Sequence, residues 1–161
     1  MTKRYGSLVG ALKQLVPIKP IPMALELSTD RCIVRDTILL AAAPIADTIS
    51  LGLIGWETVL DPVACDLYFD ALGAASTLSI GDVTYPAALA AATDTHTAAG
   101  TIKVMKSVTI GSYFLPLWQQ LGYATLAAAQ AIGSKCELLA TIAGGAATGN
   151  VTWQIKGSLR I

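Results

Sequence analysis

Hydrophobic and polar residues alternate along much of this chain with a period of two. In the clearest stretch, residues 45–82, one side of an extended chain would carry Ile45, Asp47, Ile49, Leu51 and Leu53. Further along, one side would carry Val63, Cys65, Leu67 and Phe69. Leu78 and Ile80 then flank Ser79 before a turn signal at Gly81 and Asp82. Since successive side chains of a strand point to opposite faces, this pattern predicts three short, half-buried strands.

The same pattern predicts strands on both sides of this stretch. Residues 32–34 and 37–40 give one or two strands, and residues 135–143 give another. Residues 101–110 return to a period of two, with one face formed by Ile102, Val104, Val108 and Ile110. The most regular strand is the last, whose inner face would hold Val151, Trp153, Ile155, Leu159 and Ile161. Proline near the start of an Ala/Leu-rich run favours a short helix over residues 85–92, and residues 116–121 fit a helical turn.

Many short strands separated by Gly, Pro and Asp are typical of an antiparallel sandwich or barrel. We therefore expect an all-β fold, an antiparallel β-sandwich of jelly-roll-like form. An extended N-terminal arm and one or two short helices complete the expectation. Residues 1–30 would form the arm and residues 31–161 the sandwich domain.

The expected arm differs in composition from the rest of the chain. It carries four basic residues and no acid before Glu26, and its three prolines at positions 17, 20 and 22 favour an extended course. Its apolar residues need a surface to pack on, so we interpret it as an interaction arm. The partner-binding residues expected there are Lys3, Arg4, Leu8, Leu12, Lys13, Leu15, Ile18, Lys19 and Ile21.

Charge and hydropathy narrow the possible partners. The formal net charge is zero, and only 14% of the residues are charged, against a usual share of about 25%. A surface so poor in charge indicates that other subunits cover part of it, so we expect a homo-oligomer. The neutral balance argues against a nucleic-acid partner. The apolar run 37–46 is about half the length of a membrane span, and no apolar signal-peptide core forms, so we expect no membrane partner and synthesis in a cytoplasm.

Catalytic chemistry finds no support in the sequence. Cys32, Cys65 and Cys136 are widely spaced, and His96 is the single histidine, so we expect no metal and no cofactor. Cys65 is expected to be buried, and an inter-subunit disulfide through Cys32 or Cys136 is the less favoured alternative. The carboxylates form one cluster in the sequence, interpreted as solvated or turn-capping acids: Asp61, Asp66, Asp70 and Asp82. No hydrolase or phosphate-binding motif is present, so we expect no enzyme.

The order of the motifs carries a resemblance. The run ADTISLGLIGWETVLDPVACDLYFDALGAASTLSIGD (residues 46–82) is followed by an Ala-rich insertion, then PLWQQLGY, a strand, a Gly/Ala/Thr turn and a final strand. This order resembles the small β-sandwich head proteins of tailed bacteriophages, namely capsid decoration (cement) or minor capsid proteins. The resemblance implies a jelly-roll-like sandwich, commonly trimeric, with an extended arm and no catalytic residues.

From this resemblance we expect a structural virion protein. It would be made in the host cytoplasm, bind the major capsid protein on the outer surface of a phage capsid as an oligomer, expected to be a trimer, and stabilise or decorate the head. The alternative is a carbohydrate-binding β-sandwich module of a phage fibre or host-attachment protein, using Trp56 and Tyr68.

Overall fold

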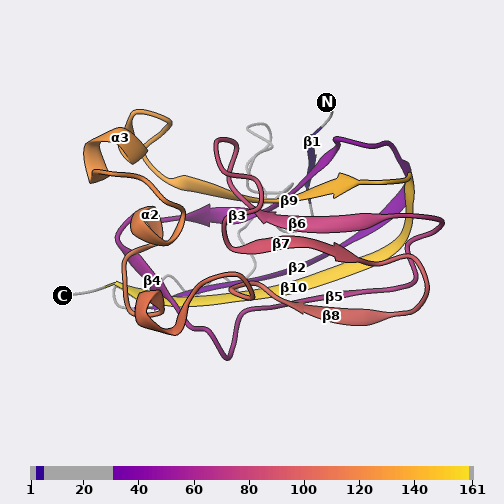
Figure 1. Ribbon diagram of the computed structural model, residues 1–161, viewed down its shortest axis with the longest axis horizontal. Helices are drawn as coiled ribbons and strands as arrows, with labels where there is room; N and C mark the ends of the chain where they lie inside the picture. The colour runs from indigo at the N-terminus through magenta and orange to yellow at the C-terminus, as the bar shows by residue number, and fades with distance from the viewer. Residues whose placement is uncertain (1–2, 6–30, 160–161) are drawn as a thin grey trace, which may run out of the picture.

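The computed structural model describes residues 3–5 and 31–159 and shows two packed β-sheets (Figure 1). One sheet has the strand order β1-β3-β9-β6-β7, with β1 Lys3–Tyr5, β3 Thr48–Ile54, β9 Cys136–Ala143, β6 Thr77–Gly81 and β7 Ala90–Asp94. The other has the order β2-β10-β5-β8, with β2 Arg31–Ala43, β10 Ala147–Leu159, β5 Asp66–Phe69 and β8 Gly100–Lys103. A further strand, β4 Thr58–Leu60, pairs with the end of β10. The predicted all-β sandwich is confirmed.

Strands β2 and β10 form the longest pair of the molecule. They run antiparallel from Ala147 opposite Ala43 to Ser158 opposite Arg31. The predicted inner face of β10 is confirmed for Val151, Trp153 and Ile155, which are all buried. These side chains pack in the core between the sheets with Ile49 and Leu138 of the opposite sheet. The two predicted segments 32–34 and 37–40 are therefore one continuous strand.

A bulge in β3 shifts the pattern that the sequence predicted there. Ser50 pairs with Leu139 and Gly52 with Leu138, so Leu51 is the extra residue without a partner in the ladder. Gly52 adopts a φ of 144° beside Val34, a conformation that favours glycine. The extra residue reverses the alternation, because Ile54 is buried while Leu53 is 48% exposed. The prediction that Leu53 lies on the face of Ile49 is wrong for this reason.

The predicted helix over residues 85–92 is also wrong. The carboxylate of Asp82 accepts hydrogen bonds from the amides of Thr84 and Tyr85, which closes a tight turn after β6. The amide of Leu89 then donates to the carbonyl of Ile80, and β7 continues the pairing with β6. Long-range pairing therefore overrides the local Ala/Leu preference for a helix.

Short helices gather at one end of the sandwich (Figure 1). The predicted turn at 116–121 is confirmed as α2 Leu117–Gln120. A second helix, α3 Leu126–Gln130, was not predicted; it starts at Thr125, whose side chain accepts a hydrogen bond from the amide of Ala128. A 3₁₀ turn, η1 Ile110–Ser112, precedes them.

Besides Leu53, Ile45 is 56% exposed although the pattern placed it on the face of Ile49, and three further apolar residues predicted to face the core are exposed. Val63 lies in the turn before β5, Ile110 in η1 beyond the end of β8, and Leu159 at the last position of β10, where the two sheets no longer cover it. The strands around them are shorter than the apolar pattern suggested.

Candidate interaction surface

A groove with a volume of about 590 Å³ lies at the end of the sheet that contains β10. Its wall is built across three strands, because Lys156 of β10 pairs with Ile33 of β2, and Ser158 pairs with Val59 of β4. Gly157 lets β4 approach β10 closely, since a Cβ there would lie 2.5 Å from Thr58 Cγ2 and 2.9 Å from the carbonyl oxygen of Val59.

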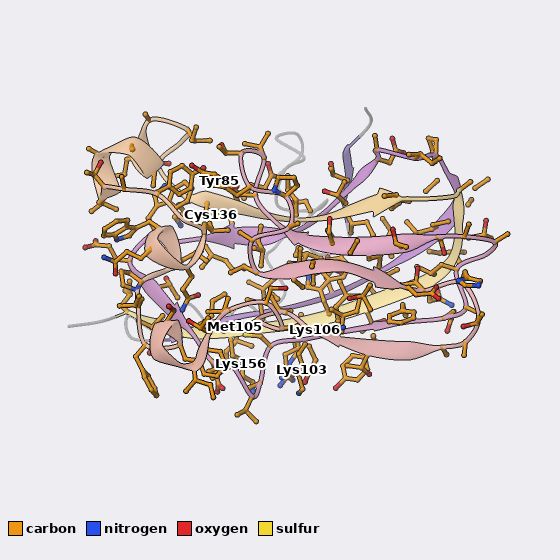
Figure 2. All side chains as sticks on the ribbon, in the orientation of Figure 1. Tyr85, Lys103, Met105, Lys106, Cys136 and Lys156 are labelled. Carbon is orange, nitrogen blue, oxygen red and sulfur yellow. The ribbon has the colours of Figure 1, made fainter. Side chains whose placement is uncertain are left out.

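The groove is mainly apolar, and its lining holds one acidic and one basic residue, Asp61 and Lys156. Its lining includes Ile33, Val59, Leu60, Asp61, Pro62 and Phe114. Phe114 is 73% exposed, and Val63, which follows Pro62, is 75% exposed. Large apolar side chains left in solvent around a hollow are typical of a binding surface. Figure 2 places Lys156 and Lys103 on the same side of the sandwich and Cys136 on the opposite sheet.

Sequence reasoning did not single out this groove. Phe114 belongs to no strand or helix, and Val59 and Ile33 look like ordinary strand residues in the sequence. The groove arises only when β2, β4 and β10 come together in space. No local signal in the chain could have identified it.

Most of the predicted partner-binding residues lie outside the described part of the chain. Leu8, Leu12, Lys13, Leu15, Ile18, Lys19 and Ile21 are among these undescribed residues. Lys3 and Arg4 lie in β1, which pairs in parallel with β3, so that Lys3 is opposite Thr48 and Arg4 opposite Ile49. The first residues of the expected arm are thus part of a sheet of the sandwich.

The four aspartates do not form one site. Asp61 accepts hydrogen bonds from the amides of Val63 and Ala64, while Asp66 forms an ion pair with Lys103, with 2.7 Å between carboxylate and amine. The carboxylate of Asp70 accepts hydrogen bonds from the backbone N–H and the side-chain amide of Asn150. Asp82 caps its turn and accepts a hydrogen bond from the hydroxyl of Tyr123. Turn capping is confirmed for Asp61 and Asp82.

Within residues 33–159 the structure contains no group of three or more metal-ligating side chains. His96 contacts the carboxylate of Asp94 in an exposed loop between β7 and β8. A carboxylate next to an imidazole can orient it, but a catalytic triad also needs a nucleophile within hydrogen-bond reach. Within the described part of the chain, the hydrogen bonds of His96 go to Asp94 and none goes to a serine, threonine or cysteine.

The tryptophans are structural. Trp56 is 3% exposed, its indole N–H donates to the carbonyl of Gly133 at 2.8 Å, and its ring packs edge-on against Tyr123. The Trp153 indole N–H donates to the carbonyl of Leu51 at 2.8 Å. Trp56 therefore presents no ring face to a sugar, whereas Tyr68 is exposed on β5. The paired platform expected for carbohydrate binding is absent from the described residues.

Three buried titratable groups, Tyr123, Cys65 and Cys136, hold their protons tightly. Burial, with a further contribution from the hydrogen bond to Asp82, raises the pKa of Tyr123 to about 12. Burial raises the pKa of Cys65 to about 11 and also raises the pKa of Cys136. A thiol that stays protonated is a poor nucleophile, so Cys65 and Cys136 behave as small apolar side chains of the core. The predicted burial of Cys65 is confirmed.

We expect both buried thiols to resist alkylation in the native protein. Folding raises their pKa values, so at pH 9 and below both are protonated in the folded chain. Between pH 9 and about 11 the unfolded chain loses a proton at Cys65 that the folded chain retains, so the free energy of unfolding falls as the pH rises. Mass spectrometry after iodoacetamide treatment at pH 8, with and without denaturant, measures the protection of the thiols. Denaturant melts from pH 8 to 11 measure the fall in the free energy of unfolding. Rapid native labelling of Cys65 would contradict its placement.

Two solved structures share the fold of this chain. A chain of the structure described as the capsid of Ralstonia phage GP4 matches with a TM-score of 0.52 and 19% identity over 99% of both chains. A chain of the cyanophage Pam1 capsid asymmetric unit matches with a TM-score of 0.52 and 14% identity, covering 81% of this chain and 85% of that one. The sandwich is thus of a kind found in phage capsids.

The sequence itself matches no protein-family model and no curated protein. Among the described residues, no helix is long and apolar enough to cross a membrane.

Proposed function

We propose that this chain is a structural, non-enzymatic protein of a phage virion. The observation that carries the proposal is the similarity of fold over 99% of both chains to a chain of the Ralstonia phage GP4 capsid. The motif order in residues 46–82 and beyond supports the same class from the sequence alone.

In this proposal the chain binds the outer surface of the capsid, with the major capsid protein as its partner, and decorates or stabilises the head. It acts as a homo-oligomer, expected to be a trimer, with no nucleic-acid or membrane partner. Contacts that are individually weak add up when several copies of a symmetric oligomer bind together, so no single strong contact is needed. Exposed apolar side chains such as Phe114 and Ile110, and the low charge of the chain, support burial of part of the surface in an assembly.

Deletion of residues 1–24 tests the role of the arm. We expect a folded sandwich, because β2, β10 and the core remain, but poor assembly or loss of binding to heads. The measurement is co-sedimentation of the purified protein with capsids that lack it, together with its mass by light scattering. Tight binding by the truncated protein, or its complete unfolding, would contradict the proposal.

The truncation also removes β1, so a point substitution is needed to isolate the contact. Lys13→Glu reverses one charge in the arm, and Lys135→Glu makes the same change at an exposed position before β9. We expect Lys13→Glu alone to weaken capsid binding, with equal thermal stability in both variants. If the full-length wild-type chain is a monomer in solution and does not bind capsids, the proposed function as a whole is overturned.

A further inference from the structure

The groove between β2, β4 and β10 has the surface chemistry of a site for an extended, proline-rich segment. Such segments bind to apolar surfaces that present aromatic rings, because a polyproline II helix is already ordered and loses little entropy on docking. Phe114 supplies an exposed aromatic ring, and Ile33, Val59 and Pro62 supply apolar contacts. Asp61 and Lys156 add one carboxylate and one amine to the lining.

The chain itself contains a segment of this kind, with the sequence PIKPIP at residues 17–22. Three of its six residues are prolines, two are isoleucines, and Lys19 carries a positive charge. The isoleucines and prolines of the segment match the apolar part of the lining, and Lys19 is opposite in charge to Asp61. Lys156 also lines the groove, so apolar contact rather than net charge carries the match. The chemistry of the segment and that of the groove are therefore complementary.

The connectivity keeps this segment close to the groove. Residues 6–30 are attached at both ends to the same sandwich, through β1 on one sheet and β2 on the other. At its C-terminal end the segment joins β2 at Arg31, which pairs with Ser158 of the groove. Ile33, which also lines the groove, follows two residues after Arg31. The eight residues between Pro22 and Arg31 can extend to about 30 Å, which is ample for folding back onto the groove.

We propose that residues 17–22 dock in the groove of their own chain. Attachment gives the segment a high effective concentration at the groove, typically in the millimolar range for a short flexible linker, so modest contacts hold it there. Docking assigns Ile18, Lys19 and Ile21 to the chain's own surface. It leaves Leu8, Leu12, Lys13 and Leu15 to contact the capsid. The arm would then leave the domain from a fixed position.

Photo-crosslinking of the purified full-length chain, without capsids, tests this proposal separately from the proposed function. A benzophenone amino acid replaces Phe114, whose exposure lets the sandwich tolerate the change. The control carries the same group at Val83, which is 64% exposed in the loop between β6 and β7. After irradiation, the mass of the product and its crosslinked peptides are determined by mass spectrometry.

We expect crosslinks from position 114 to residues 17–22 of the same chain, with about tenfold less of this product from position 83, since only the groove holds the tethered segment. The Ile18→Ser/Ile21→Ser variant should lose the crosslink while its melting temperature stays unchanged. Products joining two chains would overturn the proposal in favour of docking in a second copy. Absence of crosslinks to residues 17–22, or equal yields from positions 114 and 83, would overturn it outright.

Discussion

Replacement of Trp153 by alanine is expected to lower the free energy of unfolding by about 3–5 kcal/mol, because it removes a fully buried aromatic side chain from the centre of the core. The bulge in β3 adds to this cost. Leu51 is left out of the ladder between β3 and β9, and its carbonyl accepts the hydrogen bond of the indole instead. Without the indole, that buried carbonyl has lost its partner.

Urea denaturation of the Trp153→Ala variant measures the effect, and Ser158→Ala is the matched control from the same strand. Ser158 is exposed, so its replacement should change the free energy of unfolding by no more than about 0.5 kcal/mol. Similar losses in the two variants would mean that β10 does not have the faces described above.

Replacement of Gly144 by alanine is expected to cost about 3 kcal/mol or more, from two separate causes. Its φ of 76° lies in the left-handed region, which a residue with a Cβ adopts only with strain. An added Cβ would also lie 2.0 Å from the carbonyl oxygen of Ala75, in the backbone of a neighbouring turn. Neither chain segment can move away without disturbing the turn between β9 and β10.

Gly111→Ala is the control for this prediction. A Cβ at Gly111 would have no atom within 4 Å, and its φ is not positive. We expect the melting temperature of Gly111→Ala to equal that of the wild-type protein. The melting temperature of Gly144→Ala should be far lower, or the variant should fail to accumulate in soluble form. A Gly144→Ala protein as stable as Gly111→Ala would show that the turn has another conformation in solution.

Alternation alone predicted the sandwich because most strands bury one face. Trp153, Leu67 and Ile80 are buried where a period of two places them, and the pattern needs no knowledge of the partner strand. Turn capping by Asp61 and Asp82 could also be predicted from the sequence, because each carboxylate accepts a hydrogen bond from an amide only two residues away.

Features that depend on distant parts of the chain could not be predicted in this way. The bulge at Leu51 is set by the register with β9, and residues 85–92 fold back on β6 because Leu89 finds the carbonyl of Ile80. The groove forms only where β2 and β4 from the first half of the chain meet β10 near its end. At the bulge and in residues 85–92, a tertiary contact outweighs a local preference of about 1 kcal/mol or less.

The pairing of β2 with β10 has a consequence for biosynthesis. During synthesis β2 leaves the ribosome long before β10. More than 100 residues separate Ala43 at the end of β2 from Ala147 at the start of β10. At ribosomal rates of 5–20 residues per second, β2 waits for roughly 5–20 s with both edges unpaired and an apolar face unprotected, because β10 is its one neighbour among the described strands. A nascent chain of this kind invites chaperone binding, and slowed translation after β2 should favour aggregation over folding.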